Sequence, residues 1–184
     1  MKFSKQHNIF HFRWSVPILG EIYAQDGARF VTILNRLGIS RSVLTSTLGK
    51  LIDAGLVERN PGYGHPLRPE YLLTSEGSKV AHFCKDLIEC IQAHQANRLV
   101  QSRWALRILF LPIKGGVRFS ELISMLSPIT PRALSEELKL LSSEGYIKRT
   151  IVDGYPPTTI YELTPKSNPY LTILEKHKEN MSDY

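Results

Sequence analysis

The sequence predicts a mainly α-helical protein with small β-hairpins, an α+β fold in which one small domain occurs twice in tandem. Three observations support this prediction. The two halves of the chain resemble each other at an offset of about 90 residues. In the first part of each half, apolar residues recur at helical spacing. A turn-rich segment between two short β-forming runs then follows in each half.

The internal repeat is clearest in two Arg-Trp pairs, since Arg13-Trp14 aligns with Arg103-Trp104. Further matches follow in the same order with one compensated pair of gaps: Arg29 with Arg118, Leu44 with Leu134, Leu48 with Leu138, Gly55 with Gly145, Arg59 with Arg149, and Tyr71 with Tyr161. Because the order is preserved, chance is a poor explanation. We therefore expect two domains, residues 1–97 and 98–184, arranged as a pseudo-dimer within one chain.

The first copy begins with a helix expected after its Arg-Trp pair. A second helix is expected over apolar residues with the i, i+3, i+4, i+7 spacing of one buried face: Phe30, Ile33, Leu34 and Leu37. Gly38 marks a short turn, and Ser40 stands where the N-cap of a third helix belongs. Two helices and a turn thus lead into the third helix.

The third helix is expected over about residues 40–54, with four apolar side chains inward: Leu44, Leu48, Leu51 and Ile52. Gly55 suits the left-handed position that ends a helix. Residues 56–59 and 71–74 are expected to be strands, separated by the turn-rich segment 60–64. Three helices and a hairpin are the plan of a winged helix-turn-helix domain, and the third helix of the second copy is expected over about residues 130–144.

A long helix is expected to close the first copy, with one apolar stripe: Val80, Phe83, Cys84, Leu87, Ile88 and Ile91. We interpret this stripe as a contact between the two copies or between two chains, and an ordinary core helix is the alternative. A homodimer would use Val80, Phe83, Leu87, Ile88 and Ile91. The shorter counterpart in the second copy carries Tyr170, Leu171, Ile173 and Leu174.

The composition is that of a basic globular protein, with 184 residues and a formal net charge of +6. Such a charge suits a polyanionic partner without proving one. We find no targeting signal and no run of about 18 apolar residues, so we expect a cytoplasmic protein without membrane contact. The two cysteines, Cys84 and Cys90, are interpreted as buried thiols beyond disulfide reach of each other.

The order of these residues resembles that of the HxlR-type winged-helix transcriptional regulators. The resemblance is carried by six segments of the first copy: Arg13-Trp14, Arg29-Phe30, Ile39-Ser40, Leu44 with Leu48 and Leu51, Gly55-Leu56-Val57 with Arg59, and Pro69-Glu70-Tyr71 through Leu73-Thr74. It covers residues 13–96 closely and 103–175 more loosely. Two departures stand out, since no cysteine precedes the first helix and the usual single domain is duplicated. Redox sensing is therefore not carried over.

The resemblance implies a sequence-specific regulator whose partner is double-stranded DNA. In such domains the third helix enters the major groove and presents its outward residues to the bases. In the first copy these residues are Arg41, Ser42, Thr45, Ser46 and Lys50, and in the second copy they are Arg132, Ser135 and Lys139. The second copy also carries Glu136, Glu137 and Leu140, the last in place of Lys50. We therefore expect it to bind DNA more weakly or with another preference.

Further DNA contacts are expected from cations on the hairpins and at the start of the second helices: Arg29, Arg59, His65, Arg68, Arg118, Lys148 and Arg149. For all of these residues the alternative is a solvated polar surface. Ion pairs with nearby carboxylates are a further alternative for Arg59 and Arg149.

Other classes of function are less well supported by the sequence. No catalytic set is assembled locally, and Gly49-Lys50 lacks the remaining residues of a phosphate-binding loop, so we do not expect an enzyme. His7 and His11 lack acidic or cysteine partners, so no metal site or cofactor is predicted. The main alternative is a winged-helix scaffold for protein contacts without DNA binding. The sequence specifies no small-molecule effector.

Overall fold

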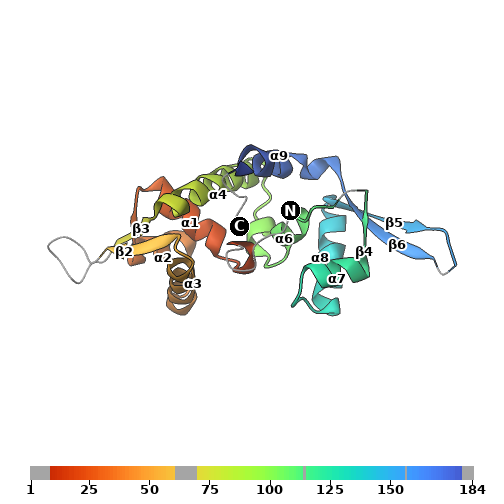
Figure 1. Ribbon diagram of the computed structural model, residues 1–184, viewed down its shortest axis with the longest axis horizontal. Helices are drawn as coiled ribbons and strands as arrows, with labels where there is room; N and C mark the ends of the chain where they lie inside the picture. The colour runs from red at the N-terminus through yellow and green to blue at the C-terminus, as the bar shows by residue number, and fades with distance from the viewer. Residues whose placement is uncertain (1–8, 61–69, 114, 156, 180–184) are drawn as a thin grey trace.

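The computed structural model describes residues 9–60, 70–113, 115–155 and 157–179 of the chain. The molecule is elongated, with the first copy at one end and the second copy at the other (Figure 1). The β-hairpins point outward at the two ends. Two helices of the two copies, α4 and α9, lie along one side, and α3 and α8 lie on the opposite side. No helix in the described part of the chain is long and apolar enough to cross a membrane.

The elements of the first copy follow the expected order, with one short 3₁₀ helix in front. They are η1 (Ile9–His11), α1 (Ser15–Ala24), β1 (Ala28–Arg29), α2 (Phe30–Leu37), α3 (Arg41–Asp53), β2 (Val57–Asn60), β3 (Glu70–Leu73) and α4 (Ser75–Ala93). The expected third helix, 40–54, therefore lies within one residue of α3 at each end.

The second copy repeats this order after a short helix that joins the copies. Its elements are α5 (Arg98–Gln101), α6 (Ala105–Leu109), β4 (Val117–Arg118), α7 (Phe119–Met125), α8 (Pro131–Ser143), β5 (Ile147–Val152), β6 (Thr158–Leu163), η2 (Pro165–Ser167) and α9 (Asn168–Lys176). The expected mainly helical fold with small β-hairpins is confirmed.

The two small antiparallel sheets have the same strand order, β1-β3-β2 and β4-β6-β5. Their registers also match, because Arg59 pairs with Tyr71 in one sheet and Arg149 pairs with Tyr161 in the other. The alignment of the two halves therefore holds at the level of single residue pairs. The strands β1 and β4, two residues each, were not expected from the sequence.

Polar caps and a left-handed glycine fix the ends of the third helices. The hydroxyl oxygen of Ser40 accepts a hydrogen bond of 3.3 Å from the backbone N–H of Val43, as expected for an N-cap. After α3, Gly55 has a φ of 70°, which confirms its expected left-handed position. The hydroxyl of Thr74 then donates to the carbonyl of Gly55 at 2.7 Å and ties the start of α4 to this turn.

Apolar side chains of the third helices face the core in both copies. Six of them are at most 3% exposed: Leu44, Leu48, Leu51, Leu134, Leu138 and Leu141. One expectation for this helix is wrong, because Ile52 is 38% exposed. Ile52 lies on the turn where the buried stripe ends, and its neighbour Leu51 takes the inward position.

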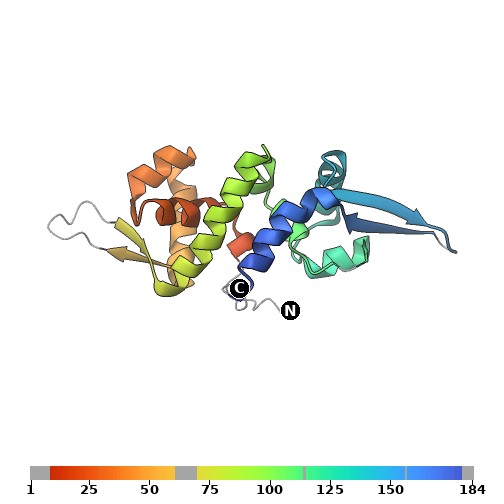
Figure 2. The same cartoon turned by 90° about the horizontal axis from the view of Figure 1, so that it is seen from above.

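The stripe on α4 packs both within the first copy and against the second copy, so each of the two interpretations holds in part. Along α4, Val80, Phe83, Cys84, Leu87 and Ile91 are at most 1% exposed. This helix packs against α1 of its own copy and against α9 of the other, beside which it lies in Figure 2. The ring of Phe83 contacts Phe10 and Phe110, with centroids 6.0 and 6.1 Å away.

This packing corrects two expectations. Four of the five residues expected to form a homodimer interface are buried within the chain, and only Ile88 is partly exposed. These four side chains therefore cannot contact a second chain while the two copies stay packed together. Of the two cysteines, both free, Cys84 is buried as expected but Cys90 is only partly buried.

Candidate nucleic-acid interface

The expected recognition face of α3 is exposed along its whole length. Five polar side chains of this face are exposed: Arg41, Ser42, Thr45, Ser46 and Lys50. Among the described residues, and apart from the neighbouring backbone of α3 itself, no atom lies within 4 Å of the position that a Cβ would take on Gly49, so the surface there is open. On this face, the outward groups are polar side chains and this glycine. The surface can therefore approach another molecule closely.

Lys50 is held by an aromatic side chain from the segment in front of α1. Its ammonium lies 4.1 Å from the centroid of the Phe12 ring, within the range of a cation–π contact. Because Phe12 precedes the Arg13-Trp14 pair, this contact orients the cation near the start of the first copy.

The matching face of α8 is also exposed but carries a different balance of charge. Arg132, Ser135 and Lys139 are exposed, as expected, and so are Glu136 and Leu140. The Nε of Arg132 donates a hydrogen bond of 2.9 Å to Oε1 of Glu136, one helical turn along. Arg132, the cation of this face nearest the N-terminus of α8, is therefore paired with a carboxylate of the same helix.

Glu137, which the sequence places near this face, does not contribute to it. Its side chain is buried, and it accepts hydrogen bonds from Nη1 of Arg98 at 2.7 Å and from the hydroxyl of Ser102 at 2.6 Å. Arg98 also pairs with Glu144. Burial alone would lower the pKa of Arg98, but its bonds to the two carboxylates raise it above its ordinary value. Glu137 thus serves the packing of α8.

The other expected DNA contacts that the structure describes lie on the outer surface. Arg29, Arg59, Arg118, Lys148 and Arg149 are all exposed. Arg29 forms an ion pair of 3.4 Å with Glu70 across the β1–β3 pair. Within the described ranges neither Arg59 nor Arg149 forms an ion pair, so that alternative is not supported. The expected contacts His65 and Arg68 lie outside the described residues.

Two arginines between the copies were not among the expected site residues. Arg13 and Arg103 are exposed and line a hollow of about 440 Å³ beside α3, together with Ser42, Ser46 and Lys50. Each guanidinium lies over the ring of the next tryptophan, 5.0 Å from Trp14 and 4.9 Å from Trp104. The repeated Arg-Trp pair was the signal in the sequence, although it served only to align the halves.

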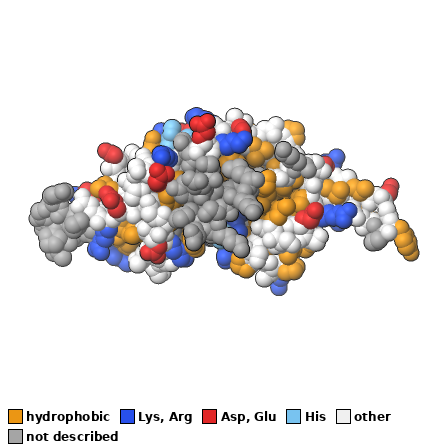
Figure 3. All heavy atoms as spheres, in the orientation of Figure 1, with side chains coloured by type: hydrophobic (Ala, Val, Ile, Leu, Met, Phe, Trp, Pro, Cys, Tyr) orange, Lys and Arg blue, Asp and Glu red, His pale blue; other side chains and the backbone are white. Residues whose placement is uncertain are grey.

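The space-filling view agrees with this distribution of charge. In Figure 3, Lys and Arg side chains occur along the lower edge of the molecule, on the side where α3 lies in Figure 1. Hydrophobic side chains mark the tip of the β5–β6 hairpin, where Ile151, Val152 and Tyr155 are exposed.

Comparison with known protein families gives the same match for both copies. The family described as HxlR-like helix-turn-helix matches residues 9–98 and again residues 99–184. The chain is 35% identical over 85 residues to the uncharacterized HTH-type transcriptional regulator YvaP of Bacillus subtilis, a match that covers 46% of this chain and 79% of YvaP. A regulator of Halalkalibacterium halodurans, BH0655, is 35% identical over 79 residues, covering 42% of this chain and 70% of that protein.

Solved structures resemble about half of the chain. A transcriptional regulator of the MarR family from Enterococcus faecalis is 25% identical with a TM-score of 0.43, covering 48% of this chain and 80% of that one. Diamide-treated YodB from Bacillus subtilis is 24% identical with a TM-score of 0.41, covering 50% and 90%. Each of these matches has about the length of one copy.

Proposed function

This chain belongs to the HxlR-like helix-turn-helix family, and we propose that it is a sequence-specific DNA-binding transcriptional regulator that reads two half-sites with one polypeptide. One observation carries the proposal: α3 and α8 lie on the same side of one molecule (Figure 1), and each has exposed polar residues. In this proposal residues 1–97 and 98–184 act as two reading domains. Helix-turn-helix dimers place two such helices in successive major grooves, about 10 bp apart.

The outward residues of α3 suit contacts in the major groove. Arg41, at the N-terminus of the helix, can bind a guanine edge or a phosphate, and Lys50 at the other end a phosphate. The hydroxyls of Ser42, Thr45 and Ser46 offer short donors and acceptors for base edges. Because Gly49 adds no side chain, the helix can enter the groove deeply.

The second copy is expected to bind more weakly or with another preference. Arg132 is paired with Glu136, so a contact with DNA first has to compete with this bond. The carboxylate of Glu136 repels phosphate but can accept a hydrogen bond from cytosine N4. Leu140 replaces the cation that Lys50 provides in the first copy.

Cations around the two helices would hold the complex in register on the phosphate backbone. The hairpins contribute Arg59, Lys148 and Arg149, together with His65 and Arg68, and the starts of α2 and α7 contribute Arg29 and Arg118. We add Arg13 and Arg103, because they lie between the two copies beside α3. A phosphate between the two half-sites would face these two guanidinium groups.

The joining of two reading domains in one chain has a thermodynamic consequence. When one copy is bound, the other meets its half-site at a high effective concentration, which raises the overall affinity without any new contact. The two copies differ in sequence, so the preferred DNA site is expected to have two unlike halves.

The test is a binding titration, measured by fluorescence anisotropy, on a duplex that was first selected from a random pool. Raising the salt from about 50 to 200 mM should weaken binding roughly 10³- to 10⁵-fold if some six to ten phosphates are contacted. The variants Arg41→Ala and Lys50→Ala should each weaken binding by about tenfold, in line with about 1–3 kcal/mol per contact. The matched control is Lys85→Ala on α4, which removes a cation from the opposite side.

The control separates a specific interface from a general effect of charge. Affinity unchanged within about twofold for Lys85→Ala supports the α3 interface, since α4 lies away from the proposed DNA. Equal losses for Lys50→Ala and Lys85→Ala would contradict it. A winged-helix scaffold without DNA binding is the alternative, favoured for the second copy by the exposed Leu140 and hairpin tip. It predicts no selected site.

A further inference from the structure

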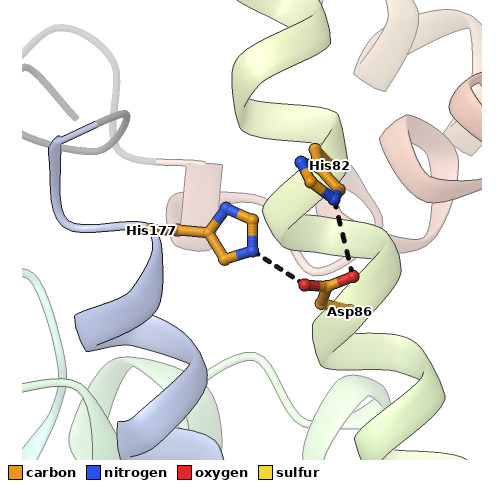
Figure 4. Close-up of side chains that lie close together, drawn as sticks. All are labelled: His82, Asp86 and His177. Atoms are coloured by element: carbon orange, nitrogen blue, oxygen red, sulfur yellow. Dashed lines mark hydrogen bonds and ion pairs between the residues drawn. The ribbon is translucent and has the colours of Figure 1, made fainter.

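Three side chains of types that can bind a metal ion come together from the two copies, on the side opposite the proposed DNA interface. His82 and Asp86 lie one turn apart on α4, and His177 directly follows α9 (Figure 4). One ligand atom from each residue lies within 4.8 Å of the others. The Nε2 of His177 is 2.8 Å from Oδ2 of Asp86, and the Nε2 of His82 is 3.8 Å from Oδ1.

We propose that His82, Asp86 and His177 form a binding site for a divalent transition-metal ion, with Zn²⁺ as the ion that fits this ligand set. Zn²⁺ commonly takes imidazole nitrogens and carboxylate oxygens at about 2.0–2.2 Å in a tetrahedral arrangement, and such ligands lie about 3.3 Å apart. The 3.8 Å between His82 and Asp86 is too long for a hydrogen bond but close to this separation. Water would complete the fourth position.

The two imidazole rings are already held in place by aromatic neighbours. The ring of His82 is stacked on Tyr23 with centroids 5.5 Å apart and planes within 8°. The ring of His177 lies edge-on to Phe83 at 5.8 Å, and the two histidines meet edge-on at 4.8 Å. His177 is 3% exposed, whereas His82 is partly exposed and leaves a route from solvent. Binding would therefore require little ordering of the ligands.

Metal binding requires one cation to leave and one proton to move. The ammonium of Lys176 lies 2.8 Å from Oδ2 of Asp86, but its side chain is 62% exposed and can turn into solvent. The proton on Nε2 of His177 would pass to Nδ1, so that Nε2 can donate its lone pair. Within the described residues the buried Nδ1 has no hydrogen-bond partner, so this change of tautomer breaks no existing bond there.

The three ligands come from both copies, so the ion would connect α4 of the first copy to the end of α9 of the second. The site would thus stabilise the contact between the copies.

The experiment uses the full chain without an affinity tag, titrated with Zn²⁺ by calorimetry, and with Co²⁺ by visible absorption. We expect one Zn²⁺ per chain, a higher Tm with Zn²⁺, and a Co²⁺ spectrum of tetrahedral type. His82→Ala should weaken binding by at least about tenfold, and Lys176→Ala should strengthen it by removing a competitor for Asp86. Since His82 is partly exposed, this variant should fold, as circular dichroism will check.

The matched control is His94→Ala, because His94 lies just past the end of α4 with its Nδ1 3.7 Å from the sulfur of Cys90. This pair is the other place on α4 where Zn²⁺ could bind. Unchanged Zn²⁺ affinity in His94→Ala together with the loss in His82→Ala supports the proposed site. Loss in His94→Ala, equal affinity in His82→Ala, or no Zn²⁺ binding would overturn it and leave a plain ion-pair cluster.

Discussion

Nη1 of Arg98 lies 2.7 Å from Oε1 of Glu137, so the first residue of α5 is bonded to the buried side of α8. The matching position in the first copy is Thr47, whose hydroxyl donates to the carbonyl of Val43 in its own helix at 2.9 Å. The two third helices are therefore anchored in different ways. In the second copy the segment that joins the copies also positions the helix proposed to read DNA.

The Arg98–Glu137 pair predicts that removing the single charge of Glu137 destabilises the protein. Glu137→Gln should lower the free energy of unfolding by about 1–3 kcal/mol, because it leaves Arg98 with fewer charged partners in a partly buried place. Urea unfolding measures this change. Glu136→Gln, one residue away but exposed, should change it by less than about 0.5 kcal/mol. Equal effects of the two variants would mean that the Arg98–Glu137 pair stabilises the protein no more than the exposed Arg132–Glu136 pair does.

Gly77 lets the start of α4 pack directly against the backbone of Leu56, the residue before β2. A Cβ at this position would overlap the backbone carbonyl of Leu56, which no side-chain rotation can relieve. We expect Gly77→Ala to cost at least about 2 kcal/mol in thermal or urea unfolding. The control is Gly49→Ala, an exposed helical position with free space around it, which should gain about 0.5–1 kcal/mol. Stabilisation by both substitutions would contradict the close packing.

The position of Phe83 between the two copies predicts that they unfold together. Its ring contacts Phe10 of the first copy and Phe110 of the second, and its side chain is fully buried. Phe83→Ala should therefore cost about 3–5 kcal/mol and shift a single calorimetric transition of the whole chain. Val31→Ala, at an exposed position, should have little effect. Two separate transitions in the unaltered chain would show that the copies are independent.

Cys84 and Cys90 are expected to react with thiol reagents at different rates. Burial raises the pKa of the Cys84 thiol well above its ordinary value, and partial burial raises that of Cys90. Since the thiolate is the reactive form, both should react slowly with a thiol reagent at neutral pH, and Cys90 should react first. Mass spectrometry of alkylated protein measures both rates. Rapid labelling of Cys84 without unfolding would contradict its burial.

Much of the fold follows from local chemistry that the sequence displays. The ends of α3 could be predicted because Ser40 can cap a helix and Gly55 can adopt a left-handed conformation, and neither requires distant contacts. The buried side of α3 followed from the spacing of its leucines. The exposure of Ile52 could not be predicted, because spacing along a helix does not show where the neighbouring elements end.

The errors at the candidate site have one physical cause, namely contacts between distant residues. The sequence places Glu137 near the outward face, and only its bonds to Arg98 and Ser102 show that its side chain is buried. Asp86 and His177 are 91 residues apart, so no spacing rule brings them together. The exposed polar residues of α3 were predictable because only their own helix determines their direction.

Hydroxyl-radical footprinting of the intact chain on its selected duplex, at a measured ratio of chains to DNA, shows whether one chain binds two half-sites. We expect one chain to protect two separate patches of the backbone about 10 bp apart. Arg41→Ala should weaken protection of the patch contacted by the first copy more than protection of the other. A single protected patch per chain, or protection that appears only with two chains per duplex, would show that one chain does not bind two half-sites.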